Sequence, residues 1–391
     1  MTKIETKAGG LTRRRFIHTC ALGVGGCFLG SLGLEALETL AGRNAPEWMA
    51  ADELWKWSKE ALFYVKTQSG ILCQKCPNFC TLVKGETGKC RNRVNHIDKL
   101  YSTAYGNPCA VHIDPIEKKP LFHFLPSTRA FSIAAAGCNL ACLNCQNWQI
   151  SQVSPKETIN EDLMPDKVVE LCLRSGSESI AYTYSEPTTF YEYAFDTAKL
   201  ARARGIRNVW KSNGYINETP LRKLSKVLDA ANIDLKSFDD TIYAKLSRGK
   251  LAPILRTLRI LKEEGVWLEI TNLVVPSWTD DLDMIERMCD WLVRNGLEDC
   301  PLHFSRFMPL YKLTHLPSTP TSVLEKARDI ALRVGVKYSY VGNVPGHAAE
   351  NTYCHKCKKM IIERKGFVII TNAVSGGKCK HCGEKIPGVW G

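Results

Sequence analysis

Three cysteines, Cys138, Cys142 and Cys145, lie close together in the segment AAAGCNLACLNCQNWQIS, residues 134–151. A structural zinc ion or an ordinary iron–sulfur cluster takes four protein ligands, and disulfides take pairs. The same spacing also describes one face of a helix, which would make these residues buried core cysteines. However, the glycine and asparagines among them favour a loop, and three adjacent thiols in a core would be oxidised easily. This trio therefore predicts a [4Fe–4S] cluster with three thiolate ligands and one iron left open to an outside ligand.

A second group of cysteines lies near the carboxyl terminus and consists of two CxxC pairs separated by 21 residues: Cys354, Cys357, Cys379 and Cys382. This spacing is close to that of a zinc ribbon, Gly383 follows the second pair, and the intervening segment can form a hairpin. We expect these four residues, the carboxy-terminal quartet, to bind Zn²⁺ as a closed site of four thiolates. A single rubredoxin-like iron is the second interpretation, and a redox dithiol is the third.

A third group lies in CQKCPNFCTLVKGETGKC and consists of Cys73, Cys76, Cys80 and Cys90. Clustering of the CxxC type in a chain of this size indicates metal ligation rather than a disulfide framework. Zinc and an auxiliary [4Fe–4S] cluster both fit these four residues, the amino-terminal quartet, and the spacing does not choose between them. A disulfide pair is the remaining alternative if the protein is exported.

The overall composition is that of a globular protein. Of 391 residues, 45% are hydrophobic and 24% are charged, which excludes a disordered or wholly membrane-embedded chain. The formal net charge of +12 could suggest a nucleic-acid partner. However, the lysines and arginines are scattered, and no basic run alternates with aromatic residues as single-strand binders require. We therefore expect no nucleic-acid partner, and we interpret the charge mainly as solvated helix faces.

The first 33 residues look like an export signal. The segment LTRRRFIHTCALGVGGCFLG has adjacent arginines, then Phe16, then a short apolar stretch that is too rich in glycine for a stable spanning helix. This order closely resembles a twin-arginine signal, which carries folded proteins across the inner membrane. We expect the translocon of that route as a partner and a periplasmic or membrane-anchored location. An arginine-rich start followed by an anchor, and a cytoplasmic location, are the alternatives.

The rest of the chain predicts an α/β architecture. Residues 34–70 have the apolar spacing of a helical linker. From residue 124 onward, short apolar strands alternate with helical patterns; the strands are 131–137, 179–184, 208–213, 230–236, 266–275 and 301–307, and the helices include 190–204, 220–228, 253–264 and 282–292. About six such units predict parallel strands in an open or partial barrel, with functional residues at the carboxyl ends of the strands.

The motifs around these strands resemble one family. The spacing CxxxCxxC is the signature of radical S-adenosylmethionine (SAM) enzymes. The segments DPIEKKPLFHFLP, CQNWQIS, YTYSEPTTFYEY, NIDLKSF and PLHFSRFMP resemble the AmmeMemoRadiSam-system radical SAM family, related to the activating enzymes of glycyl-radical proteins such as pyruvate formate-lyase. The resemblance runs from about residue 73 to the carboxyl terminus. It implies a partial (β/α)6 radical SAM barrel at 124–345, between an amino-terminal cysteine-rich module at 71–123 and a zinc-ribbon or rubredoxin-like module at 346–391.

The resemblance also implies a reaction. SAM would chelate the open iron, one electron would split its sulfonium bond, and the resulting 5′-deoxyadenosyl radical would abstract hydrogen from a substrate. A low-potential electron donor is then required. The substrate would be a protein glycine, as for the activating enzymes, or a small molecule.

Residue roles follow from the same resemblance. Glu186 matches the acid that binds the SAM amine, although Ser185 stands where relatives usually have asparagine. Lys236 would pair with the SAM carboxylate, and His303 matches a histidine that approaches SAM in the activating enzymes. Three further residues at neighbouring strand ends would line the SAM pocket: Ser212, Asn213 and Asp234.

Simpler interpretations exist for single residues. Lys236 could be an exposed strand-end lysine, Asp234 a helix cap, and His303 a hydrogen-bonded barrel histidine. The alternative for the whole chain is an electron-transfer or scaffold protein that keeps its clusters and does not cleave SAM. Glu186 together with Lys236 distinguishes the two classes, because an electron carrier needs neither a SAM-amine ligand nor a carboxylate partner.

Overall fold

The computed structural model describes residues 55–391. All of them belong to one compact unit, Asp52–Gly391. The predicted export segment, and the predicted linker up to residue 54, lie outside the described residues. Among the described helices, none combines the length and the apolar character needed to span a bilayer.

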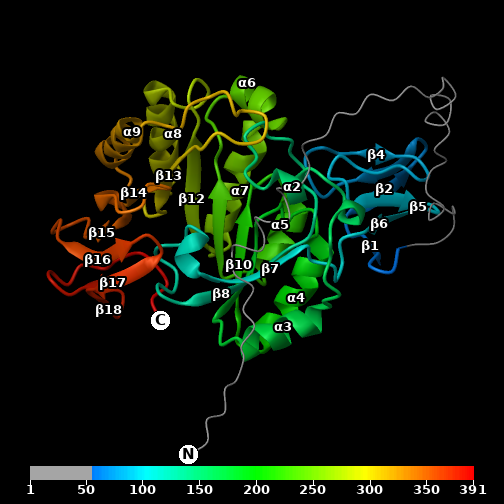
Figure 1. Ribbon diagram of the computed structural model, residues 1–391, viewed down its shortest axis with the longest axis horizontal. Helices are drawn as coiled ribbons and strands as arrows, with labels where there is room; N and C mark the ends of the chain where they lie inside the picture. The colour runs from blue at the N-terminus through cyan, green and yellow to red at the C-terminus, as the bar shows by residue number, and fades with distance from the viewer. Residues whose placement is uncertain (1–54) are drawn as a thin grey trace, which may run out of the picture. The chain divides into compact units, whose positions relative to one another are not determined.

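An eight-stranded sheet forms the centre of the fold, in the order β14-β13-β12-β11-β10-β9-β8-β7 (Figure 1). The strands β8 to β14 are parallel, and β7 pairs antiparallel with β8. In chain order these are β7 Ala110–Pro115, β8 Arg129–Ala134, β9 Ser179–Tyr182, β10 Arg207–Ser212, β11 Ala230–Asp234, β12 Trp267–Val274, β13 Leu302–Arg306 and β14 Ser339–Gly342. The two ends of the sheet, β7 and β14, do not pair, so the barrel is open.

Six helices connect the seven parallel strands, which confirms the predicted partial (β/α)6 barrel. They are α3 Pro165–Arg174, α4 Tyr191–Ala203, α5 Glu218–Ser225, α7 Leu251–Glu263, α8 Leu282–Arg294 and α9 Thr321–Val334. Shorter helical turns lie in the connections: η2 Ile116–Lys118, α2 Trp148–Ser151, η3 Pro155–Glu157, α6 Asp240–Ile242, η4 Tyr243–Ser247 and η5 Ala348–Glu350.

The barrel core comes from apolar residues on each strand and on the inner face of each helix. Ile180, Ile233 and Phe304 are fully buried members of one cluster that also includes residues of the helices. In α7, Ile254 and Leu258 lie one turn apart on the buried face, as the spacing of apolar residues predicts. The strands are therefore fixed by burial on both faces, which parallel strands require.

Residues 55–105 form two small antiparallel sheets rather than a helix. One has the order β1-β6-β5 and the other β2-β3-β4; their bounds are β1 Lys59–Glu60, β2 Tyr64–Thr67, β3 Gly70–Cys73, β4 Thr81–Leu82, β5 Arg93–His96 and β6 Lys99–Ser102. The prediction of a helical linker is wrong for 55–70. The backbone N–H of Ala61 bonds to Leu100 O at 2.7 Å, and β2 pairs with β3. Over so short a segment, pairing with other strands outweighs a helical pattern.

The carboxy-terminal segment forms a three-stranded sheet, β15-β16-β17, and a separate pair, β18-β19 (Figure 1). Their bounds are β15 Thr352–Tyr353, β16 Met360–Lys365, β17 Val368–Asn372, β18 Val374–Ser375 and β19 Lys378–Cys379. The predicted hairpin is present as β16 and β17, which turn at Gly366 with φ of 63°.

Hydrogen bonds join this carboxy-terminal segment to the barrel. Arg364 Nη2 donates to Phe122 O at 2.9 Å, and its Nη1 donates to Thr352 Oγ1 at 2.6 Å. His123 Nδ1 donates to Pro387 O at 2.7 Å, which leaves Nε2 to accept from Tyr340 at 2.6 Å.

Candidate active site

The trio lies in the loop that follows β8. Cys142 is buried, whereas Cys138 and Cys145 are partly buried, and all three are free thiols. Backbone hydrogen bonds from this loop to η4, such as Ala141 N to Ser247 O at 3.1 Å, hold it in place. Burial and the nearby Glu186 carboxylate raise the pKa of Cys138 well above its ordinary value. The thiolate form of Cys138 is therefore disfavoured unless a cation binds at this loop. Three thiolates are the ligands that an iron–sulfur cluster with one open iron takes.

Glu186 follows β9 and is a buried carboxylate, 3% exposed. Its Oε1 accepts from Ser212 Oγ at 2.7 Å and from Thr188 N at 2.9 Å, and its Oε2 accepts from Asn213 N at 2.8 Å. Burial raises its pKa above 4.5, although these hydrogen bonds oppose the shift. No Lys, Arg or His within the described chain forms an ion pair with it. Glu186 is thus a buried carboxylate that is held by hydrogen bonds and has no ion-pair partner among the described residues.

Hydrogen bonds connect Glu186 to the trio loop. Its backbone N–H reaches Gly137 O at 3.4 Å, and Thr189 Oγ1 donates to the same oxygen at 3.3 Å. Asn213 Nδ2 donates to Asn139 Oδ1 at 2.9 Å and lies 3.6 Å from Cys138 Sγ. The structure therefore brings Ser212 and Asn213 to this site, where both hold the Glu186 carboxylate.

A second charged group lies at the neighbouring strand ends. Lys236 Nζ pairs with Asp234 Oδ2 at 2.8 Å, and Lys211 pairs with the other oxygen of Asp234. Burial alone would raise the pKa of Asp234, but the two ammonium groups outweigh it and hold the pKa below its ordinary value. Burial would lower the pKa of Lys236, yet Asp234 and the Cys142 thiol raise it. Two ammonium groups share one carboxylate, so this group has positive charge available for an anion.

His303 lies elsewhere. It is the second residue of β13, and its Nε2 bonds to Glu269 Oε2 at 2.7 Å, with both side chains buried. Glu269 also accepts the backbone N–H groups of Phe122 and His123. Within the described chain, no hydrogen bond joins His303 to the trio, Glu186 or Lys236. Its predicted approach to SAM stays a prediction.

Comparison with known proteins identifies the superfamily. The family model described as "Radical SAM superfamily" matches residues 132–292. The uncharacterized protein MJ0808 of Methanocaldococcus jannaschii is 47% identical over 332 residues, covering 84% of this chain and 98% of that protein. Residues 132–292 therefore form a radical SAM domain. This domain makes the protein an enzyme, and implies a [4Fe–4S] cluster and SAM as its cofactors.

Other similar proteins are more distant. The pyruvate formate-lyase 1-activating enzyme of Escherichia coli strain K12 is 24% identical over 220 residues, which cover 52% of this chain and 89% of that enzyme. A solved structure of Streptococcus suis SuiB bound to S-adenosylmethionine is 15% identical, has a TM-score of 0.43, and covers 61% of this chain and 56% of that chain. None of these comparisons names the AmmeMemoRadiSam system.

Sequence reasoning missed two features of the radical SAM site. Lys211 escaped notice because it lies inside an apolar strand, and its polar type there was the available signal. Tyr184 adopts φ of 63°, an unusual backbone conformation for a bulky residue, and its hydroxyl bonds to Asp114. Asn147 Nδ2 donates to Tyr184 O at 2.7 Å. This hydrogen bond connects the trio loop to Tyr184, which lies two residues before Glu186.

The carboxy-terminal quartet has the geometry of a single-ion site. Among the described residues, it is the one group of three or more metal-binding side chains whose ligand atoms all lie within 4.8 Å of one another. The Sγ atoms of Cys354 and Cys382 are 3.7 Å apart, and those of Cys357 and Cys379 are 3.8 Å apart. Zn–S bonds of about 2.3 Å in a tetrahedron place sulfurs about 3.8 Å apart. The four sulfurs therefore fit one Zn²⁺ or one iron.

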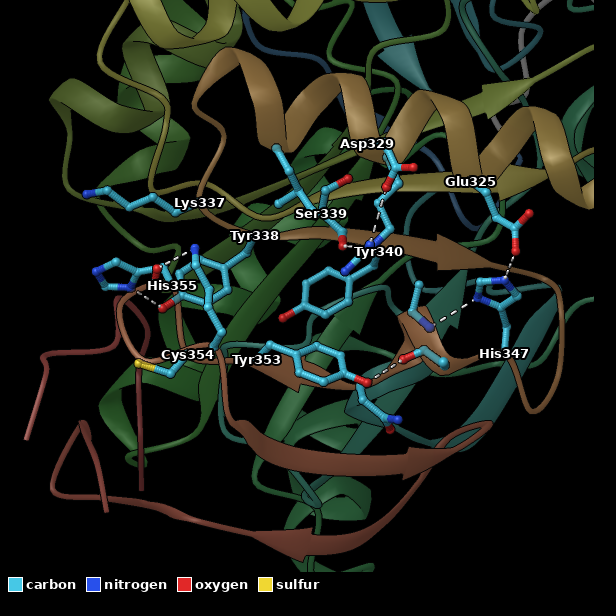
Figure 2. Close-up of a pocket in the computed structure, with 16 residues that line it drawn as sticks. Glu325, Asp329, Lys337, Tyr338, Ser339, Tyr340, His347, Tyr353, Cys354 and His355 are labelled. Carbon is cyan, nitrogen blue, oxygen red and sulfur yellow. Dashed lines mark hydrogen bonds and ion pairs between the residues drawn. The ribbon is translucent and has the colours of Figure 1, made fainter. Parts of the chain in front are cut away.

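A cavity of about 560 Å³ lies beside this quartet and away from the radical SAM residues (Figure 2). Several of its polar side chains already have partners: Tyr338 bonds to His355 at 2.8 Å, and His347 bonds to Glu325 at 3.0 Å. Cys354 lines it, but neither the trio nor Glu186 does. The cavity is large, yet its geometry does not call for a ligand, and the chemistry lies at the strand ends instead.

Proposed function

We propose that this protein cleaves SAM reductively at the trio and uses the resulting radical to abstract hydrogen from a substrate. The observation that carries the proposal is Glu186, a buried carboxylate that is held by three hydrogen bonds, lacks a cation, and lies against the trio loop. A [4Fe–4S] cluster with bound SAM supplies one-electron cleavage of the sulfonium bond, which yields methionine and a 5′-deoxyadenosyl radical. An electron carrier would have no use for such a carboxylate.

The side chains of this chain would bind SAM at both ends of its methionine part. Cys138, Cys142 and Cys145 would hold three irons and leave the fourth open. Glu186 would accept hydrogen bonds from the SAM ammonium, because it is an anion placed without a partner. Lys236 would attract the SAM carboxylate, and Lys211 would then retain Asp234 as its own partner. The buried strand ends would exclude water from the radical.

The substrate class to test first is a protein. The support is the similarity to pyruvate formate-lyase-activating enzymes, whose name says that they act on another enzyme. The motifs quoted above support the narrower assignment to the AmmeMemoRadiSam-system family. A low-potential one-electron donor is part of the proposal, since each cleavage consumes one electron.

The test is anaerobic reconstitution with iron and sulfide, followed by addition of SAM and dithionite. We expect 5′-deoxyadenosine and methionine in equal amounts. Cys142→Ala should abolish both products, whereas Cys289→Ser, which alters a buried cysteine of α8 away from the trio, should not. A reducible trio cluster that yields no 5′-deoxyadenosine would favour the electron-carrier alternative.

A further inference from the structure

The amino-terminal quartet converges on one enclosed place. Cys73 ends β3, Cys80 precedes β4, and Cys76 and Cys90 lie in the loops between strands, yet all four line a single cavity. A Cβ atom added at Gly88 would lie 3.8 Å from the Sγ atoms of both Cys80 and Cys90. Each of the four is a free thiol, and three are buried. The four side chains are therefore placed to share one metal centre.

The sulfurs of this quartet are not gathered as closely as those of the carboxy-terminal quartet. The carboxy-terminal quartet shows what a one-ion site looks like in this chain, with all four sulfurs within 4.8 Å. Among the described residues, the amino-terminal quartet does not form such a closely spaced group. A [4Fe–4S] core binds one thiolate at each corner of a cube and therefore spaces its thiolates more widely than one zinc ion does. The wider spacing favours a cluster over zinc.

The wall of the cavity carries more positive than negative charge. Lys75 and Arg93 both line it and are 1% exposed. Arg93 forms a two-pronged ion pair with Glu192, at 2.6 and 2.7 Å. Lys75 Nζ donates to Thr189 O at 3.0 Å and has no carboxylate partner among the described residues. A buried ammonium without an anion is costly. Four thiolates around an iron–sulfur core carry net negative charge, which would balance Lys75.

The quartet also lies directly against the trio loop. Arg91 Nη1 donates to Cys138 O at 3.2 Å, and Asn78 Nδ2 donates to Asn139 O at 2.7 Å. A Cβ atom at Gly137 would lie 2.5 Å from Cys90 O. Asn139, the neighbour of Cys138, lines the quartet's cavity. The residues that hold the two cysteine groups are therefore in contact, with no other element between them.

We propose that Cys73, Cys76, Cys80 and Cys90 bind a second [4Fe–4S] cluster that exchanges electrons with the trio cluster. The exchange rests on the proposed function, because it assumes a redox-active trio cluster. A reduced ferredoxin-type or flavin-type carrier gives one electron to the second cluster, which passes from the 2+ to the 1+ state. That cluster returns to 2+ as the trio cluster takes the electron and becomes 1+.

The experiment measures metal and sulfide in anaerobically reconstituted full-length protein. The wild type should contain twice the iron and sulfide of one [4Fe–4S] cluster. Cys142→Ala should keep half of both, and its dithionite-reduced form should show a [4Fe–4S]¹⁺ EPR signal that SAM does not alter. Since Cys142→Ala leaves the quartet intact, its readout does not depend on whether a quartet variant folds. A Cys142→Ala protein without iron, or with zinc at the quartet, overturns the proposal.

Quartet variants complete the test. Cys80→Ser should also lose half the iron and should retain a signal that SAM alters. Electron exchange predicts that Cys80→Ser forms 5′-deoxyadenosine more slowly than the wild type when a reduced ferredoxin or flavodoxin supplies the electrons; an unchanged rate contradicts exchange. Lys75→Met should lower the reduction potential of the second cluster, because the removed cation favours the reduced state, whereas exposed Lys84→Met should not. If the iron result holds but no 5′-deoxyadenosine forms, only the proposed function fails.

Discussion

At the scale of single residues, Glu186 shows how an unbalanced charge points to a ligand. Three hydrogen bonds fix its two oxygens, so the side chain is held in place before any ligand binds. Its charge is nevertheless costly where it lies, because burial disfavours the anion. An ammonium group bound there would remove the cost. The Glu186 carboxylate therefore favours the binding of a cationic ligand and does not stabilise the fold of the unliganded protein.

The first prediction concerns SAM affinity. Glu186→Gln keeps the shape but removes the charge, and charge-assisted hydrogen bonds are worth about 1.5–3 kcal/mol each. The substitution should weaken SAM binding at least about tenfold and leave the cluster in place. Lys236→Met should weaken binding too. Equilibrium dialysis with labelled SAM measures both, with exposed Lys262→Met as the control. Unchanged affinity in Glu186→Gln would remove the assigned role.

The second prediction concerns pH. Glu186 must be deprotonated to bind an ammonium group, and burial raises its pKa above 4.5. As the pH falls through this raised pKa, the side chain takes up a proton and SAM affinity should decline, starting at a higher pH than an ordinary glutamate would give. Glu186→Gln should lack this decline. Calorimetric titrations between pH 8 and the lower limit of cluster stability can compare the SAM affinity of the wild type with that of Glu186→Gln. The same pH dependence in both proteins would count against the assignment.

Cysteine spacing alone points to the trio, whereas Glu186 and Lys236 are singled out by the family resemblance of the motifs that contain them. Partner choice was not predictable. The hydrogen bonds from Ser212 and Asn213 to Glu186, the ion pair of Lys211, and the bond from His303 to Glu269 depend on which strands are neighbours.

At the scale of elements, the parallel sheet explains why these residues meet. Glu186 follows β9, Ser212 ends β10, and Asp234 ends β11, and the three strands are adjacent in the sheet. Parallel neighbours end at the same edge, so short strand-end segments converge there. His303 lies near the start of its strand instead, which is why its bond goes to Glu269.

The third prediction concerns Gly137, which has φ of 110° and lies against Cys90 O. Gly137→Ala should displace the trio loop from the amino-terminal module and reduce the iron content. Gly205→Ala is a matched control, because Gly205 has φ of 74° but open space around it. Gly205→Ala should lower the free energy of unfolding by only about 1 kcal/mol and should leave the iron content unchanged. Equal iron loss in both variants would mean that backbone strain, not the contact, is responsible.

The fourth prediction concerns the carboxy-terminal quartet, which we propose binds zinc. Cys379→Ser should abolish zinc binding and leave the cluster iron unchanged. Metal binding in such modules supplies folding energy of about 10 kcal/mol or more, so Tm should fall by several degrees. Metal analysis and thermal unfolding provide the measurements. Full zinc content in Cys379→Ser, or iron in place of zinc in the wild type, would contradict the proposal.

The regular elements were predictable where burial repeats clearly. The six strands from β8 to β13 are short segments of mostly buried residues, and each contains an apolar stretch that the sequence shows. The helix α9 is harder to predict, because its buried face consists of one leucine and two alanines, Leu324, Ala327 and Ala331. Strand β1 depends on pairing with β6, far along the chain, which no local pattern contains; β2 instead pairs with β3, the strand that follows it.

At the scale of the whole molecule, the fifth prediction concerns export. Arg13→Lys with Arg14→Lys preserves the charge but should block a twin-arginine route, because that route requires the arginine pair. The protein should then accumulate in the cytoplasm instead of the periplasm. Cell fractionation measures this, with Arg202→Lys on α4 as the control. A wild-type protein found wholly in the cytoplasm would rule out the proposal.

The buried partners of Lys75 and Arg93 have a consequence for the order of events during synthesis. Both cations belong to the amino-terminal module, yet Thr189 and Glu192, which accept their hydrogen bonds, are made roughly a hundred residues later. Until the ribosome has released α4, the module has two cations that it cannot bury. We therefore expect it to stay open to proteases in nascent chains that end before residue 180, and to close only in longer ones. Metal would then enter the amino-terminal quartet only after half of the protein has been translated.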